Sequence, residues 1–154
     1  DKFFAISENL NLDSLIKAGY KEIHKDLYLV PIEIGQVFRL NNVFFDFDKY
    51  NLRPESYVEL DRVVGFLNEY PNVEIEMSAH TDSKGADDYN FTLSDNRARS
   101  VREYIVSRGI AATRIISQGY GETKPVADNS NADGSDNPDG RQLNRRVEFK
   151  ILKN

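Results

Sequence analysis

Cysteine is absent from all 154 residues of the sequence. Disulfides, thiolate catalysis and zinc sites with cysteine ligands are therefore excluded. No hydrophobic run approaches the length of about eighteen residues that a membrane-spanning helix needs. A basic surplus is missing as well, because the formal net charge is −5. Neither a nucleic acid partner nor direct insertion into a membrane is therefore expected.

Histidine is scarce, with only His24 and His80 in the sequence. They show no helical His-x-x-x-His spacing and accompany no nucleophile motif, so His80 is expected to be a structural, hydrogen-bonded residue at a strand end. The Asp/Asn-rich segment 128–139 resembles a calcium loop. If Asn129 is its first residue, however, Gly140 stands where a bidentate glutamate is required. We therefore predict no enzyme, no metal and no cofactor, with calcium binding by this segment as the open alternative.

The length suits one ordinary domain with a hydrophobic core. Residues 1–36 differ in pattern from the rest, with short strands expected at Phe3–Ile6 and Tyr28–Ile32 and a connection between them over residues 10–20. This connection is too short to build a second core. We interpret residues 1–36 as the end of a preceding β-domain plus a linker, and residues 37–154 as the main domain. Any export signal or lipid anchor would lie upstream.

Periodicity in the main domain predicts alternating strands and helices. Pro54 marks the start of a helix that Pro71 stops, and a second helix is expected from Ser94 as N-cap to Gly109 at the C′ position. The other expected elements are strands at 43–47, 73–79, 115–118 and 146–151. We predict the α+β class, a two-layer β-α-β-α-β-β sandwich whose mixed sheet carries two main helices on one face.

Two charged residues are the first candidates for a binding site. Asp82 ends an expected strand and Arg97 falls in the first turn of an expected helix, where the helix dipole disfavours a cation. A short polar loop between them can bring both side chains to one pocket, which suits a zwitterionic ligand. The alternatives are a solvated Arg97 paired with a neighbour such as Asp95, and an Asp82 that caps a helical turn around residues 87–91.

Separate motifs around these residues match one known pattern. Asn90, Leu93, Ser94, Arg97 and Ala98 fit Asn-x-x-Leu-Ser-x-x-Arg-Ala, and the other motifs are His80-Thr81-Asp82 and Asn144-Arg145-Arg146-Val147. With them the sequence resembles, roughly from Val37 to Leu152, the OmpA-like C-terminal (OmpA/MotB) peptidoglycan-binding domain. The resemblance implies noncatalytic binding of peptidoglycan in the periplasm, anchoring an outer-membrane or periplasmic complex to the cell wall.

The same resemblance implies a role for each site residue. Arg97 binds a carboxylate of meso-diaminopimelate in the stem peptide through a bidentate fork, and Asp82 accepts from its ammonium group. Without ligand, Asp82 and Arg97 are expected to hold each other in place. Arg146 should point to the opposite face of the last strand from Arg145. Further ligand contacts are implied for Asn90, Arg145, Thr81, Asp48 and Lys84, the last through its backbone N–H.

A looser resemblance concerns residues 26–35, which are similar to the segment before OmpA-like domains in Bacteroidetes proteins. It implies a multidomain lipoprotein of the type IX secretion-associated kind, with the other domains of the parent and an outer-membrane complex as partners. Two other functions stay open at this point. A wall hydrolase would need an activated water for which the sequence offers no machinery, and a protein-interaction domain would have lost wall binding while keeping the fold.

Overall fold

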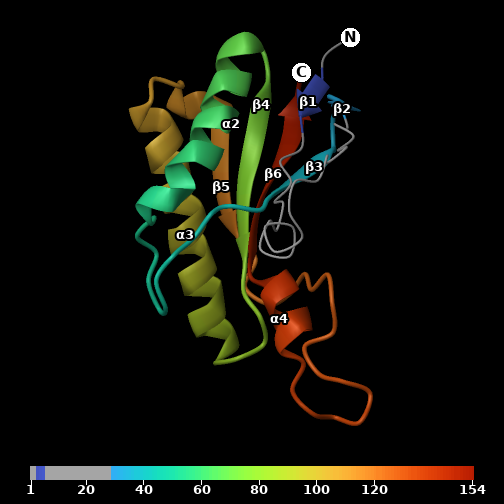
Figure 1. Ribbon diagram of the computed structural model, residues 1–154. Coiled ribbons are helices and arrows are strands. Elements are labelled where there is room, and N and C mark those ends of the chain that lie inside the picture. Colours follow the sequence, from blue (N-terminus) through green and yellow to red (C-terminus); the bar gives the residue numbers. More distant parts are fainter. Residues whose placement is uncertain (1–2, 6–28) are drawn as a thin grey trace, which may run out of the picture. The chain divides into compact units, whose positions relative to one another are not determined.

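The computed structural model describes residues 3–5 and 29–154, and the chain divides into two compact units, 1–32 and 33–154 (Figure 1). In the first unit, β1 (Phe3–Ala5) pairs antiparallel with β2 (Leu29–Pro31). Both short strands expected there are thus confirmed. The expected connection over residues 10–20 lies outside the described residues.

The second unit is built on a mixed four-stranded sheet with the order β3-β6-β4-β5. β4 and β5 are parallel because a helix connects them, whereas β6 lies antiparallel between β3 and β4. This arrangement confirms the predicted fold class. The strands are β3 (Val37–Leu40), β4 (Glu74–His80), β5 (Ile115–Gly119) and β6 (Arg146–Lys153).

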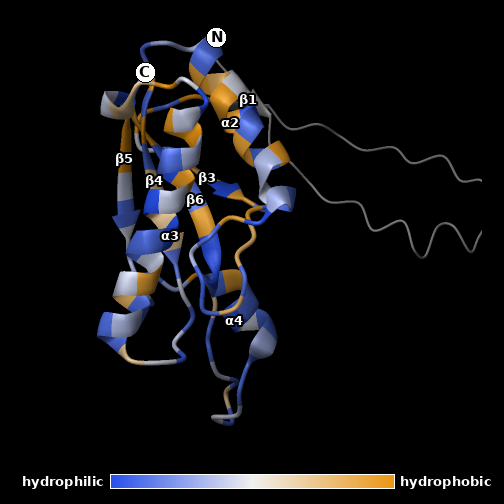
Figure 2. Cartoon of the chain, turned by 90° about the vertical axis from the view of Figure 1, so that its left-hand side faces the viewer, coloured by the Kyte–Doolittle hydropathy of each residue, from blue (hydrophilic) through white to orange (hydrophobic). Residues whose placement is uncertain are grey.

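The main helices α2 (Tyr57–Glu69) and α3 (Asp87–Ser107) lie side by side against the sheet (Figure 1). Each carries hydrophilic and hydrophobic residues along its length (Figure 2), as expected of helices with one buried side. Their apolar side chains meet those of the sheet in the core, where Leu60, Val101 and Met77 have no exposed surface. Of the described residues, no helix is both long enough and apolar enough to cross a membrane.

The structure corrects three predicted elements. Residues 43–47 form no strand, because β3 takes the place beside β6 and Phe44 instead bonds through its backbone to the Ser56 hydroxyl. The second main helix starts at Asp87 rather than at Ser94. The polar stretch before the last strand contains a short helix, α4 (Pro138–Asn144), that was not predicted.

Ser94 lies inside α3 for a tertiary reason. Its buried hydroxyl donates to the Phe91 carbonyl at 2.8 Å and accepts from the Gly121 N–H at 2.8 Å. The side chain therefore ties the helix to the chain that follows β5 instead of capping a helix end. Gly109, with a φ of 96°, follows the last residues of α3 as expected for a helix C-terminus.

Gly119 shows how closely α3 approaches β5. A Cβ atom at this position would lie 2.2 Å from the backbone nitrogen of Asp95. Gly119→Ala is therefore expected to lower the free energy of unfolding by about 2–3 kcal/mol, because neither backbone can move away cheaply. Urea unfolding monitored by circular dichroism measures the loss.

Gly65→Ala is the matched control for this substitution. Gly65 lies inside α2, and its added Cβ would meet no atom within 4 Å. The change should be neutral or stabilise by up to about 1 kcal/mol, because alanine favours helix. A Gly119→Ala protein as stable as the Gly65→Ala protein would contradict the close packing of α3 on β5.

Candidate functional site

A cavity of about 640 Å³ lies at one end of the sheet. Its lining residues come from the chain between β4 and α3, from α3 itself, from α4 and the residue after it, and from the turn before α2. Figure 1 shows where these elements lie. Every predicted site residue lines this cavity, namely Asp48, Thr81, Asp82, Lys84, Asn90, Arg97 and Arg145. Residues far apart in the sequence are thus brought to one place.

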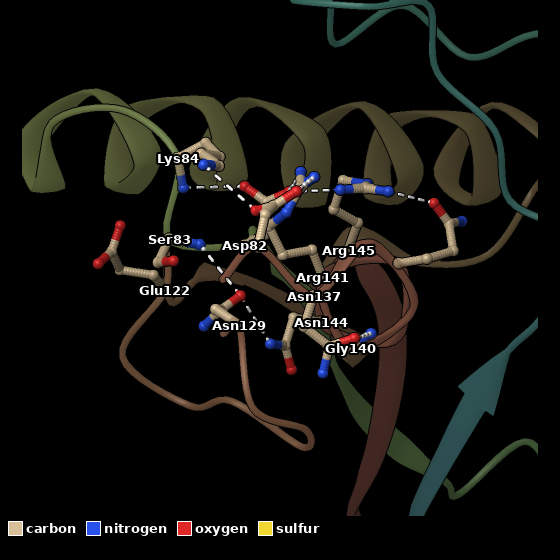
Figure 3. A network of polar contacts seen from close by, with 12 residues as sticks. Asp82, Ser83, Lys84, Glu122, Asn129, Asn137, Gly140, Arg141, Asn144 and Arg145 are labelled. Atoms are coloured by element: carbon tan, nitrogen blue, oxygen red, sulfur yellow. Dashed lines mark hydrogen bonds and ion pairs between the residues drawn. The ribbon is translucent and has the colours of Figure 1, made fainter. Parts of the chain in front are cut away.

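The Asp82 carboxylate accepts hydrogen bonds from three residues. Its Oδ1 accepts from the Lys84 backbone N–H at 3.0 Å, and its Oδ2 accepts from Arg145 and, at 3.3 Å, from Arg141 (Figure 3). Burial alone would raise the pKa of this carboxyl. The hydrogen bonds from Lys84 and the two arginines outweigh burial, so the pKa lies below its ordinary value and Asp82 is ionised at neutral pH.

Arg97 does not pair with Asp82, contrary to expectation. In the described part of the chain no carboxylate lies within 4 Å of its guanidinium group. Instead its Nε donates to the Lys49 carbonyl at 3.0 Å, and the guanidinium lies 4.9 Å from the centre of the Phe45 ring. Asp82 instead pairs with Arg141 of α4 and with Arg145, which directly follows that helix.

The position of Arg97 also removes the predicted conflict with the helix dipole. The residue lies in the middle of α3, beyond the reach of the dipole at the first turn. The solvated pair with Asp95 is wrong as well, because Asp95 bonds Arg99 at 2.9 Å. Burial is the main cause that lowers the pKa of Arg97, and the charge of Asp48 opposes it. The guanidinium thus keeps its terminal nitrogens for another acceptor.

Asn90 is a structural residue of the cavity wall. Only 2% of its surface is exposed, and its Nδ2 lies within hydrogen-bond distance of the carbonyls of Asp82 and Lys84, at 3.3 and 3.1 Å. The same nitrogen bonds the Glu122 carboxylate at 2.6 Å. These contacts hold the loop between β4 and α3 in place. Glu122 was not predicted, since nothing in its local sequence marks it.

Three further predicted residues of the cavity lining, Thr81, Lys84 and Asp48, differ in burial and in hydrogen bonding. The Thr81 hydroxyl is buried and has no partner among the described residues. Lys84 gives its backbone N–H to Asp82, while its ammonium group lies 3.3 Å from the Asp136 carboxylate. Asp48 is exposed and has a φ of 59°, a left-handed conformation that L-residues rarely adopt. Thr81 and Asp48 therefore remain open to a ligand.

Arg145 and Arg146 bond different acids, and both also line a smaller cavity next to the first. Arg145 comes directly after α4 rather than from the last strand, and it bonds Asp82 and the Gln142 side chain. Arg146 begins β6 and donates through Nε to Glu148 at 2.6 Å. Arg141 was missed by the sequence analysis, although the cap at Asn137 and the proline at 138 could have indicated the short helix that carries it.

Segment 128–139 has the hydrogen bonding of a turn. Asp133 accepts from the Ser135 N–H at 3.0 Å, and Asn137 caps α4 by accepting from the Gly140 N–H at 3.0 Å. Asp136 pairs with Lys84 and Arg141. Within residues 3–5 and 29–154, no group of three or more His, Cys, Asp or Glu side chains could hold a metal ion.

His80 ends β4 and is 3% exposed, as expected of a structural residue. The expected hydrogen bond is not found, because neither ring nitrogen has a well-aligned partner among the described residues. Stacking on Tyr120 at 5.3 Å holds the ring instead. Nε2 lies 3.4 Å from the Glu148 carboxylate, close enough for an ion pair when the ring is protonated.

Glu148 predicts an acid-sensitive contribution to stability. Burial alone would raise its pKa, but contacts with His80 and Arg146 lower it from 4.5 to about 2. A lowered pKa means that the stabilisation is complete above pH 4.5 and is lost as the pH falls toward 2. The total is up to about 3 kcal/mol. Glu148→Gln should weaken the dependence of the thermal unfolding midpoint on pH between pH 5 and pH 2.5. The same substitution at the exposed Glu69 should leave that dependence unchanged. Identical pH profiles would contradict this assignment.

The OmpA family model matches residues 44–138, which is more than half of the chain. The chain belongs to the OmpA family. A chain of this family, outer membrane porin F of Pseudomonas fluorescens, is 42% identical over 77% of this chain and 35% of its own length. The peptidoglycan-associated lipoprotein of Rhizobium meliloti is 39% identical over 56% of this chain and 49% of its own.

A further relative of this OmpA family chain, from Gloeobacter violaceus, is named photosystem I P700 chlorophyll a apoprotein A2. It is 51% identical over 79% of this chain, but the match covers only 14% of that protein. The chain thus spans less than half of the length of each of these relatives. Among solved structures, the cell wall anchor of the T6SS from Pseudomonas aeruginosa is 26% identical with a TM-score of 0.61. That match covers 77% of this chain and 80% of the other.

Proposed function

We propose that this domain binds peptidoglycan through the diaminopimelate of the stem peptide. One observation carries the proposal: an arginine without a carboxylate partner in the described part of the chain, Arg97, shares a cavity of about 640 Å³ with the carboxylates of Asp48 and Asp82. Such a cavity offers opposite charges to both ends of a zwitterion. The names of a peptidoglycan-associated lipoprotein and of a cell wall anchor among its relatives support this proposal.

The free end of diaminopimelate fits the acceptors and donors that remain. Its carboxylate accepts two parallel hydrogen bonds from the terminal nitrogens of Arg97, a bidentate geometry that a lysine could not provide. Its ammonium group donates to Asp82, whose Oδ1 accepts a single hydrogen bond from the described residues and therefore keeps a lone pair. Asp48 adds a second carboxylate at the cavity rim, and the buried Thr81 hydroxyl gains a partner.

In this proposal the other predicted site residues position the ligand-binding groups rather than contact the ligand. Arg145 sets the position and charge of Asp82, while Lys84 contributes its backbone N–H to the same carboxylate. Asn90 holds the loop that carries both Asp82 and Lys84. The ligand therefore meets a preorganised site, which reduces the ordering that binding requires.

The proposed role is anchoring in the periplasm, at the outer membrane and cell wall. A single zwitterionic contact is weak, but many stems on one polymer give firm attachment. Residues 1–36 belong, in this proposal, to the end of a preceding β-domain plus a linker. The parent is then a multidomain Bacteroidetes lipoprotein of the type IX secretion-associated kind, which tethers an outer-membrane complex. Mass spectrometry of the parent after crosslinking in cells identifies the complex.

A pull-down on insoluble peptidoglycan tests the binding itself. The purified domain should sediment with the wall and release no soluble muropeptide, in buffer with a chelator or with added zinc or calcium. Release of muropeptides would indicate a hydrolase. Failure to sediment would favour the alternative of a protein-interaction domain, and sedimentation that requires calcium would assign a metal to segment 128–139.

Stems that differ at the third position test the zwitterion. We expect a stem with lysine there to bind about ten- to a hundredfold more weakly than one with diaminopimelate. Lysine offers the ammonium group for Asp82 but leaves Arg97 without a carboxylate. Isothermal titration calorimetry measures both affinities. Equal values would mean that Arg97 reads another part of the wall.

A further inference from the structure

A second cavity, of about 190 Å³, lies next to the first and shares Phe45, Arg97 and Arg145 with it. Its charged lining consists of guanidinium groups, from Arg97, Arg145 and Arg146, and none of the described residues lines it with a carboxylate. The other lining residues are Val43, Phe44, His80, Gln142 and Val147. A cavity with this lining favours an anion.

The neighbouring acids do not cancel this positive charge. Arg145 donates to Asp82, and Arg146 donates to Glu148 at 2.6 Å. Arg97, by contrast, has no carboxylate within 4 Å in the part of the chain that the structure describes. Of the five N–H groups of Arg97, Lys49 takes one and a bidentate fork in the first cavity takes two, so two remain for an acceptor in the second cavity.

His80 gives a second, independent indication of a ligand. Its side chain lines the cavity, is 3% exposed, and has a Nδ1 without a partner among the described residues. Stacking on Tyr120, with 15° between the ring planes, fixes the imidazole. A buried nitrogen without a partner is unfavourable, and an oxygen of a bound group would satisfy it once the nitrogen carries its proton.

We propose that the second cavity binds a further carboxylate of the peptidoglycan stem peptide. This inference rests on the proposed function, in which the first cavity holds the zwitterionic end of diaminopimelate. Arg97 and Arg145 line both cavities, so one ligand extends from one to the other without leaving the protein surface. The volume accommodates a carboxylate group and its adjoining atoms. A stem peptide has two such groups, the α-carboxylate of its γ-linked glutamate and its C-terminal carboxylate.

Calorimetry with amidated stems tests the inference. The unmodified tetrapeptide stem is compared with the same stem amidated either at the glutamate or at the C-terminus. One of the two amidations should lower the affinity about ten- to a hundredfold, because a charge-assisted contact is lost. The amidation that does so identifies the carboxylate.

Gln142→Glu provides the matched variant. Gln142 is exposed and accepts from Arg145, so glutamate keeps that acceptor while adding a negative charge at the second cavity. The variant should bind the unmodified stem as weakly as the wild type binds the amidated one. Gln36→Glu makes the same charge change directly before β3, away from the second cavity. It should change neither the affinity for the unmodified stem nor that for the amidated stem.

Nuclear magnetic resonance of the His80 ring reports on the cavity directly, with His24→Gln used to assign its signals. The unmodified stem should shift these signals, and diaminopimelate alone should shift them much less. Equal affinities for free and amidated stems would overturn the inference and leave the first site intact. An equal shift with acetate would assign the cavity to free anions and overturn it too. If no stem binds at all, the proposed function and this inference both fail.

Discussion

Arg97→Ala is expected to remove most of the binding to peptidoglycan while leaving the fold intact. In the described part of the chain the guanidinium has no ion pair, so its loss leaves no buried carboxylate unpaired in the free protein. In the complex a bidentate charged contact is lost, at a cost of about 2–4 kcal/mol, or about thirty- to a thousandfold in affinity. Pull-down and calorimetry measure the loss, and circular dichroism checks the fold.

Two other arginine variants sharpen this test. Arg99→Ala removes an exposed arginine of the same helix that pairs with Asp95, and its binding should equal that of the wild type. Arg97→Lys keeps the charge but loses the planar fork, so its affinity should fall between wild type and alanine. If folded Arg97→Ala binds the wall like the wild type, Arg97 is not the carboxylate receptor.

Asp82→Asn is expected to lower both the stability of the fold and the affinity for peptidoglycan, whereas Arg97→Ala should lower the affinity alone. The carboxylate balances Arg145 and Arg141 and accepts the Lys84 N–H, so its neutralisation removes the carboxylate partner of Arg145 and leaves Arg141 with Asp136. The free energy of unfolding should fall by about 2–3 kcal/mol. Affinity for diaminopimelate stems should fall by at least about tenfold, because the ammonium loses its acceptor and the two arginines turn repulsive.

Asp136→Asn is the control for the structural part of this effect. It removes an acceptor of Arg141 and Lys84 that is far more exposed than Asp82, and exposed pairs contribute less than about 1 kcal/mol. Chemical unfolding and calorimetry on the two variants separate the roles. An Asp82→Asn protein with unchanged stability would contradict the pairing with the two arginines.

Local periodicity was sufficient for most of the fold. The alternation in residues 73–79 and 146–151 predicted β4 and β6, and Gly109 predicted the end of α3. These patterns are visible in sequence because each strand or helix has one face toward the core. The strand at 43–47 was wrong because its aromatic residues suit a strand in isolation. Only the pairing of β3 with β6 decides which segment joins the sheet.

The first residue of a helix was harder to predict, because an N-cap residue and a buried polar residue look alike in the sequence. Ser94 has the chemistry of an N-cap, yet it is buried inside α3 because Gly121 donates to its hydroxyl. The true start follows Ala86, whose side chain makes no capping bond, and only the acids at 87 and 88 mark it. A residue type that serves both as a cap and as a buried tertiary contact cannot be assigned without its partner.

The sequence by itself predicted much of the cavity lining, since every predicted site residue lines the cavity, but it missed Arg141. It could not determine their pairing. Asp82 was expected beside Arg97, but its arginine partners are Arg141 and Arg145, which lie 59 and 63 residues later. Motifs identify residue types, whereas ion pairs depend on distances that α4 and the end of β4 set only after the sheet has formed. That Arg97 has no carboxylate partner among the described residues, on which the proposed function depends, is therefore a property of the tertiary structure.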